Sequence, residues 1–306
     1  MDMGHFNEEL RVLTSSGYPE STVRGIEELE AMLDRETALG AEVDAIVSAF
    51  AEENRMPLCD ALAAIGEIAR KYGKNEYSLD LLLIVNSLPF LHAKYRANNI
   101  PDSVFYASMD DIRCKVAECV ECMGVVGTFV AGWYDGFFNM TRFAYGRFQY
   151  EEVTYDGENV KLSCGKTLKN GDVFVNFHIP SSGIPLTDEV RFASYREAYK
   201  HFKDRFEDGI VIFGCFSWLL YPRHREFLPE NSNILRFMDD FETIRSYEAD
   251  RFHDAWRVFG RFAEEPAERL PRDTSLRRAY ADWLAAGEKT GEGFGFFAFD
   301  GENILR

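Results

Sequence analysis

The sequence predicts an α+β protein in which a helical N-terminal domain, residues 1–135, precedes a sheet-containing domain, residues 136–306. A length of 306 residues favours two domains, because single domains usually have about 150 residues. Apolar residues recur three and four positions apart as far as about Tyr134. After Asn139 the period becomes twofold, in segments rich in aromatic and β-branched residues. We therefore expect a helical core and a sheet core, joined between about Thr128 and Asn139.

The expected N-terminal helices share amphipathic spacing and recognisable ends. Pro57 is a favourable first residue for one helix, and Gly73 is a typical residue to end it. Pro89 interrupts or kinks another, because proline lacks the amide hydrogen that a helix interior needs. We expect about five helices, over residues 21–33, 43–50, 58–72, 79–91 and from 108 onward.

The second domain is expected to begin with an antiparallel meander. Turn signals Asp156-Gly157 and Asn170-Gly171 separate its three strands. Residues 209–220 are so uniformly apolar that they predict an interior strand. The expected strands cover 141–155, 159–164, 173–180, 209–220, 255–260 and 294–299, and the expected helices 187–206, 231–247 and 275–286.

Net charge and hydropathy exclude several classes of protein. The 34 basic and 51 acidic side chains give a net charge of −17, which disfavours nucleic acid, because binding to phosphates needs a basic surface. The N-terminal residues lack the basic and apolar segments of a signal peptide. The longest apolar stretches, 123–134 and 209–222, are shorter than the roughly 20 residues that span a membrane. We expect a soluble, cytoplasmic protein with no membrane or nucleic-acid partner, and these patterns leave its oligomeric state open.

Six cysteines are too few for a disulfide scaffold in a chain of this length. Cys119 and Cys122 have the spacing of a zinc ligand pair, but no second pair completes four ligands. Packing of small side chains in a helix is the alternative, and we expect no metal.

Polar side chains alternate along two of the expected strands. Read as one continuous strand, 141–155 places Arg147, Gln149 and Glu151 on one face, and 173–180 places Asn176 and His178 together. If the meander stacks as expected, these residues form one surface, where a neutral His178 can accept a proton near pH 7. The alternatives are an ordinary solvated sheet face and a structural histidine.

A Ser/Gly loop then leads into a helix. Ser181, Ser182 and Gly183 lie just before a helix that Thr187 can cap, and amides at a helix start can bind phosphate oxygens. A strand-to-helix turn without any ligand explains the same residues. A GxxxxGK[ST] motif, a GxGxxG fingerprint and a GxSxG elbow are all absent from the sequence.

The order of these elements, meander, strand, Ser/Gly loop, helix, apolar strand, resembles the GNAT (Gcn5-related N-acetyltransferase) fold. Four segments look like bacterial two-domain acyltransferases with a helical N-terminal domain: residues 145–151 (YGRFQYE), 175–183 (VNFHIPSSG), 213–222 (FGCFSWLLYP) and 228–234 (LPENSNI). The resemblance covers nearly the whole chain. It implies a GNAT-like mixed, mostly antiparallel sheet flanked by helices, and acetyl-CoA or another acyl-CoA as donor.

The resemblance also implies where the donor binds. Strand 173–180 matches the central GNAT strand, and Ser181, Ser182 and Gly183 fall in its pyrophosphate loop, which here lacks the leading Arg or Gln of the family pattern. Pantetheine would lie between this strand and residues 210–218, with Ser217 and Trp218 near the opening. On the helix that follows, Asn233, or Asn231, would face the cofactor.

We therefore predict an acyltransferase that moves an acyl group from coenzyme A to an amine of a small-molecule or peptide acceptor. His178 and Glu151 are the predicted bases. The predicted acceptor-binding residues are Arg147, Gln149, Asn176 and Trp218. The alternatives are a non-catalytic binding module that has lost the coenzyme A loop, and an enzyme that uses the same cleft for other chemistry.

Overall fold

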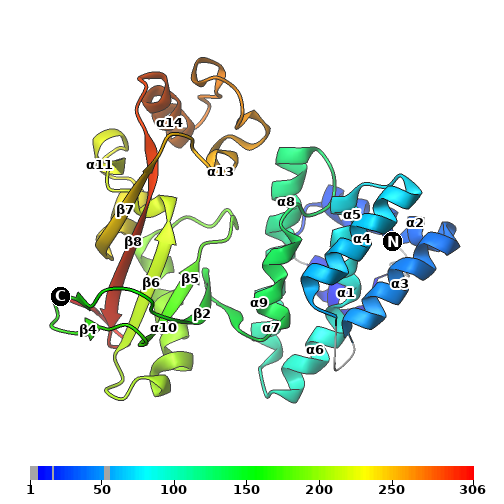
Figure 1. Ribbon diagram of the computed structural model, residues 1–306, viewed down its shortest axis with the longest axis horizontal. Helices are drawn as coiled ribbons and strands as arrows, with labels where there is room; N and C mark the ends of the chain where they lie inside the picture. Colours follow the sequence, from blue (N-terminus) through cyan, green and yellow to red (C-terminus); the bar gives the residue numbers. More distant parts are fainter. Residues whose placement is uncertain (1–5, 16, 52–55) are drawn as a thin grey trace. The chain divides into compact units, whose positions relative to one another are not determined.

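The computed structural model describes residues 6–15, 17–51 and 56–306, and the chain forms two compact units, residues 1–143 and 144–306. The first unit is helical and the second contains the sheet, which confirms the predicted fold class (Figure 1). The predicted boundary at residue 135 stays a prediction, and the compact units divide eight residues later, after Phe143.

The helical unit is built around a buried central helix. In α5, Leu79 and residues 81–85 are at most 1% exposed, because this helix packs against α2, α3, α4 and α6. The described elements are α1 (Glu8–Thr14), α2 (Glu20–Arg35), α3 (Thr37–Ala51), α4 (Leu58–Tyr72), α5 (Glu76–Asn86), α6 (Leu88–Ala97), α7 (Asp102–Met109), α8 (Asp111–Met123), the 3₁₀ helix η1 (Ala131–Tyr134) and α9 (Asp135–Phe138).

The predicted helix boundaries hold where proline and glycine determined them. Pro57 is the N-cap of α4, and Gly73 ends that helix in the left-handed conformation. The expected helix 79–91 is divided at Ser87, with Pro89 in the first turn of α6. The prediction of about five helices was too low, because short apolar helices between two breaks carry too few residues to show a period.

The sheet unit has the strand order β1-β2-β5-β6-β8-β7, with β9 beside β8. The pairs β2–β5, β6–β8, β7–β8 and β8–β9 are antiparallel, whereas β5 and β6 run parallel. The strands are β1 (Arg142–Tyr145), β2 (Phe148–Thr154), β3 (Val160–Lys161), β4 (Thr167–Leu168), β5 (Val173–His178), β6 (Val211–Ser217), β7 (Glu242–Ala249), β8 (Thr290–Phe299) and β9 (Ile304–Leu305).

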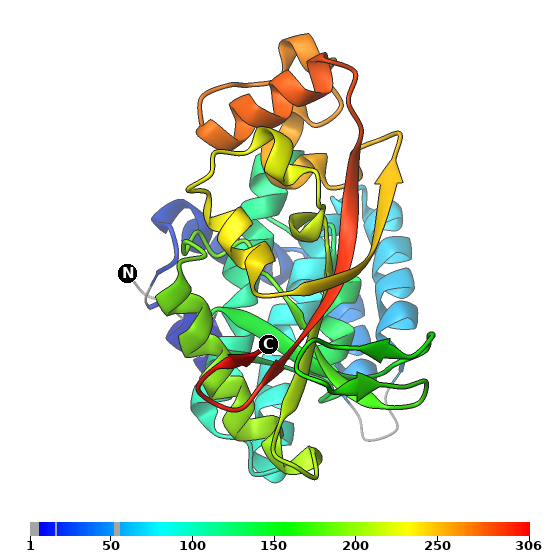
Figure 2. The ribbon, with the colours of Figure 1, turned by 90° about the vertical axis from the view of Figure 1, so that its left-hand side faces the viewer.

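Helices connect these strands. Helix α10 (Asp188–Phe202) joins β5 to β6, and α12 (Asn233–Asp239) precedes β7. Helices α13 (Ala255–Phe259) and α14 (Ser275–Ala285) gather at one end of the long strands β7 and β8, in orange in Figure 2. The shorter elements are the α-helix α11 (His224–Phe227) and the 3₁₀ helices η2 (Lys203–Arg205), η3 (Trp218–Leu220), η4 (Gly260–Phe262) and η5 (Ala267–Arg269).

Four sequence predictions for this unit were wrong. The expected strand 141–155 is two strands with a turn at Gly146, whose φ is +61°. The expected three-stranded meander is a direct β2–β5 pair, with β3 and β4 forming a separate two-stranded sheet in the connection. Residues 255–259 are helical rather than extended, and the expected helix 231–247 ends at Asp239 because β8 pairs with the residues that follow.

The sheet separates two cores. Phe148, Tyr150, Val175 and Phe213 face a large aromatic core that includes residues of α10 and α12. On the opposite face, a smaller core contains Tyr155, Leu162, Leu168, Phe174, Ile212, Phe296 and Ala298. Alternation along β2 and β5 therefore directs one set of side chains into each core.

Candidate active site

Glu151, Asn176 and His178 form one polar cluster on the face of the smaller core. Glu151 and Asn176 lie directly opposite each other in the β2–β5 register, and His178 lies two residues further along β5. The Nε2 atom of His178 is 2.6 Å from Oε1 of Glu151, and Nδ2 of Asn176 donates to the same oxygen at 3.3 Å. The side chains of His178 and Glu151 are 26% and 17% exposed. The structure thus brings together the two predicted bases and one predicted acceptor-binding residue.

The contact determines where the histidine proton lies. An ionised Glu151 at 2.6 Å from Nε2 requires a proton between the two atoms, so Nε2 donates. In a neutral imidazole the lone pair then lies on Nδ1. Nδ2 of Asn176 is also 3.2 Å from Nε2, but a protonated Nε2 has no lone pair to accept a hydrogen bond, so Asn176 donates to Glu151 instead. In this arrangement Glu151 holds the proton on Nε2 of His178, and Nδ1 is the ring nitrogen that can act as a base.

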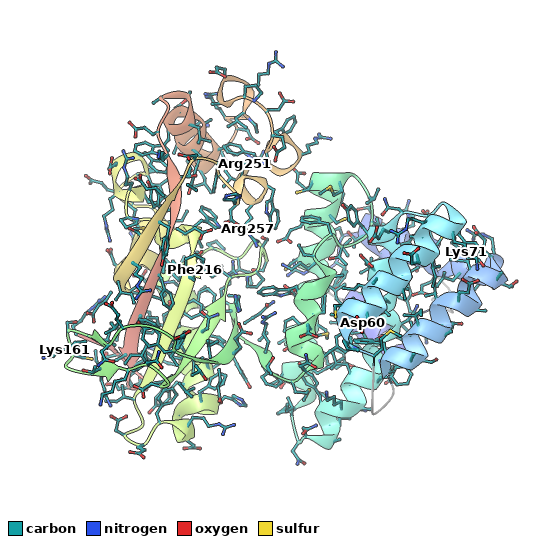
Figure 3. The ribbon with its side chains drawn as sticks, viewed as in Figure 1. Asp60, Lys71, Lys161, Phe216, Arg251 and Arg257 are labelled. Carbon is teal, nitrogen blue, oxygen red and sulfur yellow. The ribbon has the colours of Figure 1, made fainter. Side chains whose placement is uncertain are left out.

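The parallel strands β5 and β6 separate beside this cluster. Their register contains the pairs Val175 with Phe213 and Asn176 with Gly214, and the described pairing ends there although both strands continue. His178 on β5 and Phe216 on β6 therefore lie beyond the paired residues, on the same face of the sheet as Asn176. Figure 3 labels Phe216. Phe216 is 53% exposed. Diverging parallel strands leave backbone groups that an extended ligand can bind.

The loop after β5 leads directly to the start of α10. Gly183 has φ +78°, and a Cβ atom built on it meets nothing within 4 Å. The amide of Ser182 donates to Pro180 and that of Ile184 to the Ser182 side chain, so these two amides are used within the loop. Thr187 caps α10, because its hydroxyl accepts from Val190, and the first turn of any helix leaves amides unpaired within the helix. Unpaired amides at a helix start can bind an anion.

Arg147 lies under this loop. Its Nε donates to the carbonyl of Ile184 at 3.0 Å and its Nη1 to the carbonyl of Pro180 at 2.7 Å. The residue is 8% exposed. Arg147 lies in the turn between β1 and β2, outside the strand whose alternation includes Gln149 and Glu151.

Arg191 binds the other end of the loop. It is 2% exposed, donates to the carbonyl of Leu186 at 2.8 Å, and forms a two-bond pair with Asp240 at 2.6 and 3.1 Å. The Tyr195 hydroxyl donates to the same carboxylate at 2.9 Å. Burial raises the pKa of Asp240, and Arg191 acts in the opposite direction. Sequence analysis missed this group, because α10 and α12 are distant in the chain.

The remaining predicted site residues lie at several places. Gln149 is 2% exposed and lies opposite His178 in the register. Ser217 caps η3 by accepting from the Leu219 amide, and half-buried Trp218 packs edge-on against Tyr280. Half-buried Asn233 is the first residue of α12, where Ser232 is the N-cap. Ser181 and Gly183 are exposed and Ser182 is half-buried.

Within residues 6–15, 17–51 and 56–306, no group of three or more His, Cys, Asp or Glu side chains has the arrangement of a metal site. Cys119 is buried in α8 and burial raises the pKa of its thiol to about 11, so this cysteine is a core residue there. In the same part of the chain, no helix has the length and apolar character needed to cross a membrane.

Comparison with known protein families matches nearly the whole chain. Residues 143–297 match the GNAT-like C-terminal domain, and residues 9–140 match the N-acyltransferase N-terminal domain. A search of curated proteins found no match.

Similar solved structures are acyltransferases. One, in complex with decanoyl-CoA and teicoplanin, is 21% identical over 98% of this chain and 88% of its own, with a TM-score of 0.69. An orf11* acyltransferase mutant in complex with octanoyl-CoA is 21% identical over 95% of this chain and 88% of its own, with the same TM-score. A third, in complex with decanoyl-CoA, is 22% identical over 94% of this chain and 98% of its own, with a TM-score of 0.62. At these identities the likeness shows the fold.

Diverging parallel strands followed by a loop and a helix start define a GNAT-like transferase domain. With the helical domain before it, the chain belongs to the family of two-domain N-acyltransferases with a GNAT-like C-terminal domain. This confirms the predicted family and the prediction of an N-acyltransferase.

Proposed function

We propose that this enzyme transfers a medium-length acyl chain from coenzyme A to an amine of a glycopeptide-like acceptor, with His178 as the base. The contact between His178 and Glu151 beside the separating strands β5 and β6 carries the proposal. The donor class is supported by similar structures that bind octanoyl-CoA and decanoyl-CoA, and the acceptor class by one that binds teicoplanin.

In the proposed reaction, the acceptor nitrogen attacks the thioester carbonyl, a carbon–nitrogen bond forms, and the carbon–sulfur bond breaks. His178 Nδ1 accepts the proton that the amine loses, and the coenzyme A thiolate takes up a proton as it leaves. Glu151 holds the Nε2 proton and stabilises the imidazolium that forms. Asn176 keeps Glu151 in place through its 3.3 Å hydrogen bond.

The donor diphosphate is proposed to bind at Ser181, Ser182, Gly183 and the first turn of α10, with pantetheine between β5 and β6. The positive φ of Gly183 and the open space beside it support this position. Ser217 at the end of β6 and Asn233 on α12 are proposed to line the same donor site, and Gln149 and Trp218 the acceptor site.

His178→Ala tests the base. We expect kcat to fall about 10²-fold or more, because a positioned base contributes that much, while the melting temperature stays close to that of the parent. Glu151→Gln is expected to have a smaller effect and to alter the acid limb of the pH–rate profile. Exposed His253→Ala is the matched control and should retain parental kcat. A parental kcat in His178→Ala would exclude His178 as the base.

Donor and acceptor classes are tested by comparing acetyl-, octanoyl- and decanoyl-CoA with a glycopeptide amine as acceptor. We expect the highest kcat/KM for the two longer donors. Preference for acetyl-CoA, or no transfer to the glycopeptide, would contradict the proposed substrates without affecting the family assignment.

Gly183→Glu tests the diphosphate site, because the new side chain adds bulk and negative charge there. Titration calorimetry with coenzyme A should detect no binding at concentrations that saturate the parent. Gly183→Ala is the control: it introduces the same backbone strain at φ +78° without the charge, and should bind with an affinity within a few-fold of the parent's. Parental affinity in Gly183→Glu would exclude this loop.

A further inference from the structure

Two buried arginines hold three carbonyls of the loop between β5 and α10. Arg147 binds the carbonyls of Pro180 and Ile184, and Arg191 binds that of Leu186. The two arginines are 8% and 2% exposed, so both act from beneath the loop. The loop residues above them are largely exposed, with Ile184 at 48%.

In a trans peptide, the direction of a carbonyl also determines the direction of the next residue's amide. The carbonyl of one residue and the amide of the next lie in the peptide plane and point in opposite directions, and the described chain contains no cis peptide bond. Holding the Pro180 carbonyl inward therefore turns the Ser181 amide outward, and holding the Leu186 carbonyl inward does the same for Thr187. Residue 185, after Ile184, is a proline and has no amide hydrogen. Holding the Ile184 carbonyl inward therefore turns no amide hydrogen outward.

The β1–β2 turn places Arg147 at this position. Its Gly146 lies so close to α10 that a Cβ atom would be 3.0 Å from Cα of Ser194. The Ser194 hydroxyl accepts from the Phe148 amide at 3.3 Å and donates to the Tyr145 carbonyl at 2.5 Å. The turn is thus fixed to the helix that begins at the proposed diphosphate site.

We propose that Arg147 is a positioning residue for the donor diphosphate: it holds the Pro180 carbonyl inward so that the Ser181 amide faces the phosphates, and its bond to the Ile184 carbonyl fixes the loop. This rests on the proposed donor site. Because its guanidinium is buried, Arg147 acts through the loop and does not itself contact the ligand. It differs from the acceptor-binding role that the sequence pattern predicted for this residue.

Two donors with the same acyl-pantetheine part test the proposal: decanoyl-CoA, and S-decanoyl-pantetheine, which lacks the diphosphate and the adenosine 3′-phosphate. In Arg147→Ala, we expect KM for decanoyl-CoA to rise about 10- to 100-fold, the value of one hydrogen bond to a charged group, with kcat little changed. KM for S-decanoyl-pantetheine and KM for the acceptor should equal the parental values. Arg147→Lys should recover part of the loss, because an ammonium can still donate to one carbonyl.

Arg205→Ala is the matched control, since this arginine follows α10, is 68% exposed and pairs with Glu152. It should leave all these constants unchanged. A rise in acceptor KM with both donors would assign Arg147 to the acceptor and overturn the proposal. An equal loss with both donors together with a lower melting temperature would show a merely structural role and also overturn it.

Gly183→Glu, measured in parallel, separates this proposal from the proposed donor site. If Gly183→Glu loses decanoyl-CoA binding while Arg147→Ala keeps the parental KM, the positioning role alone is wrong. If Gly183→Glu keeps parental affinity, the donor site itself is wrong, and the role of Arg147 falls with it.

Discussion

The buried pair of Arg191 and Asp240 should be the most sensitive point of the sheet unit. Arg191 is 2% exposed and Asp240 is 6% exposed, and the two are joined by hydrogen bonds of 2.6 and 3.1 Å. Replacing either partner by an apolar residue leaves the other charge buried, which costs about 3–5 kcal/mol. For a unit of this size each kcal/mol lowers the melting temperature by about 2–4 °C, so we expect a loss of about 6–20 °C.

A double-mutant cycle measures the pair itself. Arg191→Met and Asp240→Leu are compared with the double variant by urea denaturation at pH 7. Because the double variant contains neither charge, its free energy of unfolding should lie closer to the parent's than that of either single variant. Single variants within about 1 kcal/mol of the parent, or strictly additive losses, would refute the reasoning, since values that small are typical of exposed pairs.

Two further predictions concern the cores. Burial raises the pKa of Asp80 and of Glu30 to about 7. Between about pH 4 and 7 the folded chain therefore holds protons that the unfolded chain releases. The folded state loses stability as the pH rises through this range. Asp80→Asn should therefore gain about 3 kcal/mol relative to the parent between pH 5 and 8, and an equal difference at both pH values would contradict this. Gly214→Ala places a Cβ atom 2.6 Å from the Phe174 ring and 2.7 Å from the Phe296 ring, so it should cost about 1–3 kcal/mol, and an unchanged thermal melting curve would contradict that.

The fold class could be predicted because its signals are local. Amphipathic spacing, Pro57 and Gly73 marked helices, and the alternation along β2 and β5 marked the face that carries Glu151, Asn176 and His178. Pairing between the strands then brought the last three within hydrogen-bond distance. The position of His178 relative to Glu151 was accessible to sequence reasoning, because both residues obey the same twofold rule on neighbouring strands.

The sequence analysis applied the twofold rule to Arg147, although this residue lies in a turn before β2 begins at Phe148. A glycine inside an expected strand is a signal for a bend, and Gly146 is one, with φ +61°. Arg147 lies in this turn, so the alternation inside β2 does not determine where its side chain points. The contact of Arg191 with Asp240 had no comparable local signal, because the two residues are 49 positions apart in the sequence. They meet only when α10 and α12 come together in the fold.

Arg147 and Arg191 both donate hydrogen bonds to carbonyls of the loop. The proposed site therefore binds its anionic donor through loop amides, and not through these two guanidinium groups. A site made of exposed cations binds by charge attraction that salt screens beyond about 10 Å at 0.1 M. Amide donors held in place from beneath bind phosphate oxygens at contact distance, where screening is weak. Asp188 and Glu189 in the first turn of α10 would repel the diphosphate over longer distances, and salt weakens that repulsion. The affinity for decanoyl-CoA should therefore change little, or rise, as the ionic strength increases, whereas a steep fall would indicate that exposed cations bind the diphosphate instead of the loop amides.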